Sequence, residues 1–196
     1  KNPEIKVIGK DSANLVLRMY ADNSNAKKYI EYVYTLKGNS YVVGYKINVV
    51  GLQDIMAAGT DELNLEWQHN VKRLEKSLKN ERIVSTIYFK PSGDDVDNLS
   101  ETSDKSESIK TSLNWISFKQ QFFAVSLIAE KNFASADMQT ITDERTNVFV
   151  KKMIAKVAIP LNIGQSSTNM QFYIGPNKYK DLRKIGDRNP GGWNLV

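Results

Sequence analysis

The strongest constraint on the fold of this chain is a two-residue period of apolar side chains along most of its length. Alternation that is rich in valine, isoleucine, tyrosine and phenylalanine is typical of β-strands. Residues 29–36 and 41–50 carry it on either side of a short Lys-Gly-Asn-Ser turn, which predicts a hairpin. We expect further strands at residues 5–8, 15–20, 83–90, 148–159 and 170–174.

Helical patterns are few. Val71, Leu74 and Leu78 are spaced three and four residues apart, which predicts a short amphipathic helix. Residues 115–129 also fit a helical spacing, but their β-branched and aromatic content favours a strand. Residues 176–185 form the best predicted helix, because a proline opens the segment and a glycine follows it.

These patterns together predict the fold class. The chain has 196 residues, of which 41% are hydrophobic, and this is enough to bury a sizeable core. Nine to twelve strands with little helix predict a mainly β fold, a single large β-sandwich that spans residues 1–196. Residues 92–112 are polar and lack an apolar period, so we expect a long mobile loop there. No apolar run approaches the roughly 20 residues needed to cross a bilayer.

The residue inventory restricts the chemistry that the chain can perform. It has no cysteine and one histidine, which excludes disulfides, a thiolate nucleophile and a multi-histidine metal site. Asp94, Asp95 and Asp97 do not follow the alternating ligand pattern of a calcium loop, so a solvated loop is favoured. His69 could exchange protons with Glu66 in a sugar-processing sandwich, but it lacks a second positioned catalytic group. We therefore predict no catalytic residue, no metal and no cofactor.

The charge is unevenly distributed. The net charge is +5, and residues 145–196 contain nine lysines and arginines against Asp181 and Asp187. Such a basic quarter indicates an anionic partner, either nucleic acid or a lipid headgroup surface, with a solvated basic face as the alternative. The many aromatic residues could stack on single-stranded nucleic acid. Aromatic residues in strands mostly fill the core, however, and no nucleic-acid-binding motif is present.

The C-terminal segment is the most distinctive part of the sequence. Tyr179, Leu182 and Ile185 give the predicted helix an apolar stripe at three-residue spacing, and basic residues surround it. A basic amphipathic helix followed by a tryptophan is typical of an interfacial segment, although the same helix could pack on its own sheet. The residues that we expect to make interactions are Tyr179, Leu182, Arg183, Lys184 and Trp193.

At this point the sequence resembles a known family, the large periplasmic domain of the YidC-type bacterial membrane protein insertases, in its Bacteroidetes-like variants. The order and spacing of several stretches carry the resemblance, although no single motif is highly specific. They include the hairpin, the tryptophan-led K-Q-Q-F-F strand pair, a strand-Gly-Pro-helix element and a terminal Gly-Trp. In all, six stretches carry the resemblance, at residues 29–47, 63–70, 75–90, 113–128, 172–182 and 189–193.

The resemblance implies a β-supersandwich similar to galactose-mutarotase-like domains, closed by a short C-terminal helix at about 176–185. It implies a location in the periplasm, as one domain of a bacterial inner-membrane protein whose next membrane span would follow the chain. The insertase groove of the family lies in a later region, so no residue of that groove can be assigned here. The implied partners are accessory subunits of the Sec translocon, nascent membrane proteins and the membrane surface near the C-terminus.

Three functions compete at this stage. The first is a non-enzymatic interaction domain of an insertase that inserts and folds inner-membrane proteins, alone or with the Sec translocon. The second is a carbohydrate-binding or mutarotase-like sandwich, which would need an aromatic such as Trp67 or Trp115 exposed for sugar stacking. The third is a basic nucleic-acid binder, whose affinity would fall steeply with salt. The resemblance favours the first, with no nucleic-acid partner.

Overall fold

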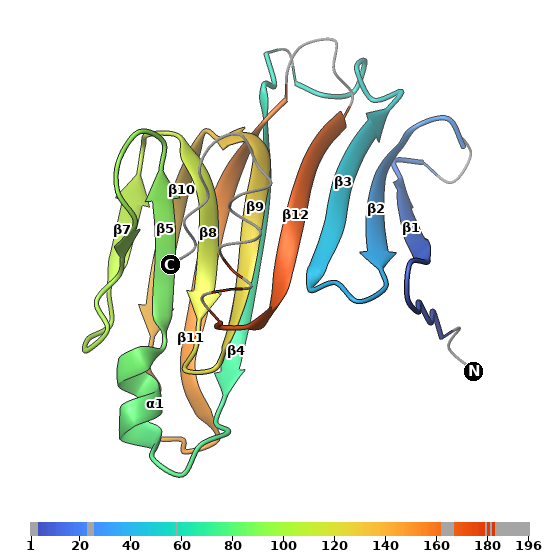
Figure 1. Ribbon diagram of the computed structural model, residues 1–196. Coiled ribbons are helices and arrows are strands. Elements are labelled where there is room, and N and C mark those ends of the chain that lie inside the picture. The colour runs from blue at the N-terminus through green and yellow to red at the C-terminus, as the bar shows by residue number, and fades with distance from the viewer. Residues whose placement is uncertain are drawn as a thin grey trace.

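Two antiparallel sheets face each other in the computed structural model, which describes residues 4–22, 26–57, 59–161, 167–178, 180 and 182 (Figure 1). The large sheet consists, in spatial order, of β1 (Ser12–Tyr20), β2 (Tyr29–Lys37), β3 (Val42–Val50), β12 (Ser167–Pro176), β9 (Phe123–Phe133), β8 (Leu113–Lys119), β5 (Thr86–Pro91) and β6 (Asp97–Asn98). The small sheet consists of β4 (Glu62–Lys72), β11 (Phe149–Pro160), β10 (Ser135–Ile141) and β7 (Ser106–Ile109).

The main core lies between the two sheets. Side chains of successive strand residues point to opposite faces, so each strand contributes every second residue to this core. Ile116, Phe118 and Leu127 of the large sheet are fully buried there, and Met153 and Val157 of the small sheet face them. The prediction of a mainly β sandwich is therefore confirmed.

A second, smaller cluster covers the opposite face of the large sheet. Trp115 and Tyr173 are almost completely buried in it, together with Ala124, Ile128 and Leu182. The middle strands of the large sheet thus have apolar neighbours on both faces. This explains why β8 reads as a nearly continuous run of apolar and aromatic residues.

The predicted hairpin is present as β2 and β3, which pair in register from Tyr29 opposite Val50 to Leu36 opposite Val43. Asn39 in the connecting turn has a φ of 55°, a conformation that asparagine tolerates. The segment at 115–129 forms the strands β8 and β9, joined by a tight turn. Residues 5–8, in contrast, are not a strand.

The short helix lies later in the chain than its apolar spacing predicted. Residues 62–72 form β4, because their alternation pairs them with β11, and α1 (Leu78–Val84) follows. Ser77 caps this helix by accepting a hydrogen bond from the Asn80 backbone N–H at 3.4 Å. The strand predicted from residue 83 consequently begins only at Thr86.

The polar segment at 92–112 is more ordered than a loop. It contains β6 and β7, and Leu99 between them is fully buried. Asp104 accepts hydrogen bonds from the backbone N–H and the hydroxyl of Thr142, at 2.8 and 2.7 Å. The strands here are too short to produce a visible apolar period, which is why the sequence pattern favoured a loop.

The predicted C-terminal helix falls mostly outside the described residues. Pro176 ends β12 instead of opening a helix, but Lys180 and Leu182 are helical, and the Leu182 N–H donates to the Lys178 carbonyl at 3.0 Å. Within the part of the chain that the structure describes, no helix has the length and apolarity needed to cross a membrane.

Candidate interaction surface

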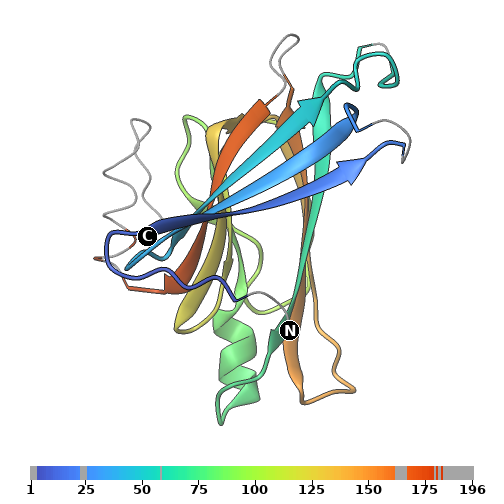
Figure 2. The same cartoon turned by 90° about the vertical axis from the view of Figure 1, so that its right-hand side faces the viewer.

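One end of the large sheet is not covered by the small sheet. β1, β2 and β3 extend past β4, the nearest strand of the small sheet, as Figure 1 shows, and Figure 2 shows the same strands from the side. The exposure of β1 agrees with this arrangement, since eight of its nine residues are exposed. A strand with this composition is normally buried, so the three strands form the first candidate site.

The face of these strands that continues the core is apolar and carries no charge. Every second residue of β1 points to it, and each is paired across the ladder with an apolar or aromatic residue of β2. Leu15, Leu17 and Met19 are 40%, 49% and 57% exposed. We call this surface the apolar wing face, and it consists of Ala13, Leu15, Leu17, Met19, Ile30, Tyr32, Tyr34 and Leu36.

A row of aromatic rings connects the apolar wing face with the core. Tyr34 stacks on Tyr45 with ring centroids 4.9 Å apart, and Tyr45 contacts Phe172 at 5.3 Å. Trp67 of the small sheet lies against Phe172 and stacks on Phe118 at 3.7 Å. Burial raises the pKa of the Tyr45 phenol. The aromatic row is buried at Phe118 and partly exposed at Tyr34, which suits a preformed contact surface.

The opposite face of the same strands carries their charges. Arg18 is the one charged residue of β1, and its guanidinium donates to the Glu31 carboxylate at 2.7 Å and lies over the Tyr29 ring. Asn48 donates to the other Glu31 oxygen at 2.8 Å. These hydrogen bonds to Arg18 and Asn48 lower the pKa of Glu31. The polar groups are thereby held away from the apolar wing face.

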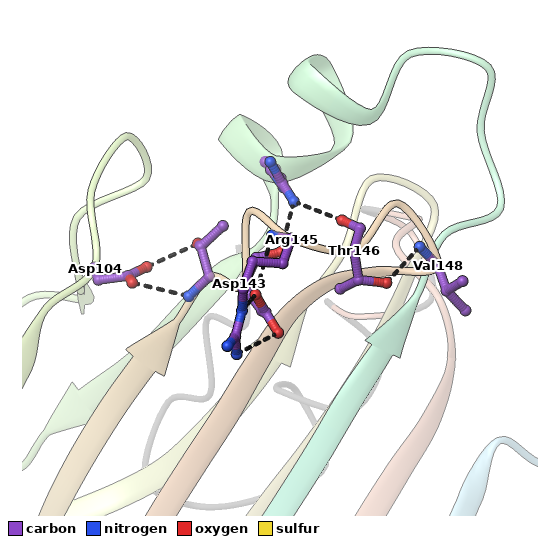
Figure 3. A network of polar contacts seen from close by, with 7 residues as sticks. Asp104, Asp143, Arg145, Thr146 and Val148 are labelled. Atoms are coloured by element: carbon purple, nitrogen blue, oxygen red, sulfur yellow. Dashed lines mark hydrogen bonds and ion pairs between the residues drawn. The ribbon is translucent and has the colours of Figure 1, made fainter.

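The end of the sandwich next to α1 holds a second concave region. Two cavities of about 930 and 660 Å³ lie there on either side of the 142–144 turn. Figure 3 shows the polar network of this turn, in which the Arg82 guanidinium donates to the Asp143 and Thr146 carbonyls at 3.2 Å each. Arg145 pairs with the Asp143 carboxylate at 2.9 Å.

Lys151 forms part of the walls of both cavities and is buried. Its ammonium group donates to the backbone carbonyls of Ser85 and Glu101, at 2.9 and 3.0 Å. Desolvation lowers its pKa, while Asp104 and Glu101 act in the opposite direction. Lys151 therefore connects the segments at Ser85 and Glu101 to β11, which is a structural role.

Of the five residues that we expected to make interactions, the structure describes one, Leu182. Leu182 is 3% exposed and packs with Trp115, Ala124, Ile128 and Tyr173, so it faces the protein. Tyr179, Arg183, Lys184 and Trp193 lie outside the described residues, and their role stays a prediction. The apolar wing face was missed because an apolar run predicts a buried strand, and the sequence does not reveal that β1 is at an edge.

The geometry disfavours sugar chemistry. Glu66 and His69 lie on opposite faces of β4, since they are three residues apart in a strand, so they cannot form a dyad. Burial lowers the pKa of His69, whose ring lies 3.4 Å from the Gln120 amide. Trp115 is 1% exposed and Trp67 is stacked on Phe118, which leaves neither as an open platform for a sugar ring.

Three of the six described bases in the basic C-terminal quarter are buried or lie close to an acidic side chain. Lys151 is buried, Arg145 pairs with Asp143, and Lys156 lies 3.9 Å from Glu66. Within the described ranges, no group of three or more histidine, aspartate and glutamate side chains could hold a metal ion.

Comparison with known proteins identifies the family. Residues 4–190 match the profile of the YidC periplasmic domain. The chain is 30% identical over 191 residues to the membrane protein insertase YidC of Bacteroides fragilis. The matched region covers 97% of this chain and 30% of the relative. It is 32% identical over 180 residues to the same protein of Parabacteroides distasonis, covering 91% and 28%. The chain thus spans less than a third of the length of these relatives. These matches confirm the predicted resemblance and the periplasmic assignment, and the chain belongs to the YidC periplasmic domain family.

Proposed function

We propose that this chain is the periplasmic accessory domain of a membrane protein insertase, and that it acts by binding rather than by catalysis. The relatives that it matches are named membrane protein insertases, and the chain corresponds to less than a third of each. In this proposal the domain holds apolar segments of membrane proteins on the periplasmic side while other parts of the insertase place them in the bilayer.

The observation that carries the proposal is the apolar wing face. Soluble proteins rarely expose a contiguous apolar surface of this kind unless it is an interaction site. A membrane protein segment presents the same chemistry, since its side chains are apolar and carry few charges. Leu15, Leu17 and Met19 would contact such a segment, and the aromatic row would support them from the core side.

Accessory subunits of the Sec translocon are the second proposed class of partner. The support for them is the family resemblance. Purification of the tagged insertase under mild detergent conditions would test this proposal, with co-purification of Sec accessory subunits as the expected result. Their absence from the complex after chemical crosslinking in cells would contradict it.

A binding experiment tests the apolar wing face directly. A fluorescent leucine-alanine peptide, flanked by lysines for solubility, would be titrated with the domain and followed by anisotropy. Leu17→Lys should weaken binding by about tenfold, because it replaces an apolar contact with the peptide by a charge. Val16→Lys is the matched control, since Val16 lies on the same strand, is similarly exposed and points to the opposite face. Equal binding by the two variants would contradict the proposed function.

A further inference from the structure

Four segments that are far apart in the sequence meet at one end of the large sheet, the lower end of β12 and β3 in Figure 1. We call them together the turn rim, which consists of residues 8–11, 37–41, 119–123 and 174–178. Each segment is bonded to the next through the backbone. The N–H of Gly38 donates to the Asp11 carbonyl at 2.9 Å, that of Ile174 to Tyr41 at 2.9 Å, and that of Asn177 to Phe122 at 2.7 Å.

The turn rim exposes large apolar side chains on each of its four segments. Two adjacent phenylalanines stand at the β8–β9 turn, and one apolar side chain stands on each of the other three segments. The exposed residues are Ile8 (64%), Tyr41 (53%), Phe122 (54%), Phe123 (50%) and Ile174 (52%). Half or more of each of these side chains is exposed, so burial in the core does not account for them.

The charges on the turn rim are mostly positive. The four segments contain four lysines against the single acid Asp11, and one of the lysines, Lys119, lies with its ammonium 4.2 Å from the centre of the Tyr88 ring. The other lysines are exposed. The four are Lys10, Lys37, Lys119 and Lys178. This balance complements an anionic surface.

The turns are held in place by the structure. The Gln120 N–H donates to the Phe123 carbonyl at 2.8 Å, which closes the β8–β9 turn, and the Asn177 side chain donates to the Gln120 carbonyl at 3.4 Å. Gly175 leaves no room for a side chain, since a Cβ there would lie 2.8 Å from the Tyr41 ring. The exposed side chains are therefore presented on a preordered backbone, which reduces the entropy lost on binding.

We propose that the turn rim is a docking surface for the headgroup layer of an anionic lipid bilayer. Phe122, Phe123 and Tyr41 would enter the boundary between headgroups and acyl chains, where aromatic side chains are favoured. The lysines between them would reach the lipid phosphates. Each of the four segments carries both a lysine and an exposed apolar side chain, so each could contact the headgroups and the acyl chains together. The turn rim and the apolar wing face share no residue, so this inference goes beyond the proposed function.

Vesicle flotation tests the docking surface. The 196-residue chain should float with vesicles of phosphatidylethanolamine and phosphatidylglycerol, and only weakly with neutral phosphatidylcholine vesicles. Combining Phe122→Ser with Phe123→Ser should reduce partitioning by about tenfold. Combining Lys37→Gln with Lys178→Gln should also reduce it by about tenfold or more at low salt. The matched control combines Val16→Ser with Ile55→Ser, which removes two exposed apolar side chains outside both surfaces and should leave partitioning within about twofold.

A site-specific probe gives a second, independent test. Because the chain has no cysteine, Phe122→Cys provides a single thiol for an environment-sensitive fluorophore. Its emission should shift to the blue with anionic vesicles, whereas the same dye on Gln53→Cys, at the other end of the large sheet, should not respond. Failure of the unaltered chain to bind anionic vesicles would overturn the proposal. Equal losses in the rim and control variants, or equal dye responses at both positions, would overturn it as well.

Discussion

The strands β8 and β1 belong to the same sheet and are similarly rich in apolar residues, yet their surroundings are opposite. β8 is buried on both faces, by the small sheet on one side and by the cluster around Trp115 on the other. β1 is exposed on both faces, and no described strand pairs with its outer edge. The comparison teaches that an apolar strand at the edge of a sheet is available for partners, whereas the same composition at the centre stabilises the fold.

Replacing a buried and an exposed phenylalanine by alanine, one at a time, should give the largest difference in the free energy of unfolding. Phe118→Ala is expected to destabilise the domain by about 3–5 kcal/mol, because it removes a fully buried ring that stacks on Trp67. Phe122→Ala, only four residues away and half exposed, should cost less than about 1 kcal/mol. Urea unfolding followed by tryptophan fluorescence would measure both. Similar losses in the two variants would show that the burial contrast is wrong.

The cluster on the outer face of the large sheet can be opened through Leu182. Leu182→Asp places a charge among Trp115, Ala124 and Tyr173, so it should destabilise the packing of this segment by about 2–4 kcal/mol. Asp95→Asn in the exposed polar segment is the control and should be neutral. In cells that depend on the full-length insertase, Leu182→Asp should impair growth more than Asp95→Asn. Equal growth of the two strains would contradict the prediction.

Substitutions on the apolar wing face should change the stability of the domain much less than substitutions in the core. Leu17→Thr replaces a half-exposed side chain by a good strand former, so the free energy of unfolding should change by less than about 0.5 kcal/mol. Thermal unfolding of the purified variant would measure it. A loss of several kcal/mol would mean that Leu17 is covered by the protein itself, and the apolar wing face would then not be a free surface.

The smallest expected effect concerns His69, the single histidine of the chain. Burial lowers the pKa of His69 below its ordinary value of about 6.5, so the unfolded chain takes up the proton first as the pH falls. The contribution of the neutral ring is thus present above the ordinary pKa and is lost as the pH falls towards the lowered one. His69→Gln should lack this decline when unfolding is measured between pH 7 and pH 5. Parallel pH profiles of the two proteins would refute the assignment.

Much of the fold could be predicted from the sequence, because strand alternation and turn residues are local signals. The β2–β3 hairpin illustrates this, since its alternation and its Gly-Asn turn determine both strands. The helix was misplaced because residues 71–74 fit a helical spacing, while pairing with β11 decides their conformation. β6 and β7 were missed for a different reason, because strands of two to four residues carry no detectable period.

The candidate surface was less predictable than the fold. The sequence favoured the C-terminal segment, of which Leu182 is buried and most other residues lie outside the described ranges. The apolar wing face depends on which strand stands at the edge of the sheet and on how far the small sheet reaches. Both are properties of the long-range topology, and a single sequence does not reveal them.

The central claim is that the apolar wing face receives segments of membrane proteins, and photo-crosslinking in cells tests it most directly. In the full-length insertase, p-benzoylphenylalanine would replace Leu17 in one strain and Val16 in another, so that the probe points to either face of β1. The account predicts crosslinks from position 17 to newly synthesised inner-membrane proteins, and few from position 16. Equal crosslinking from both positions, or none from position 17, would contradict it.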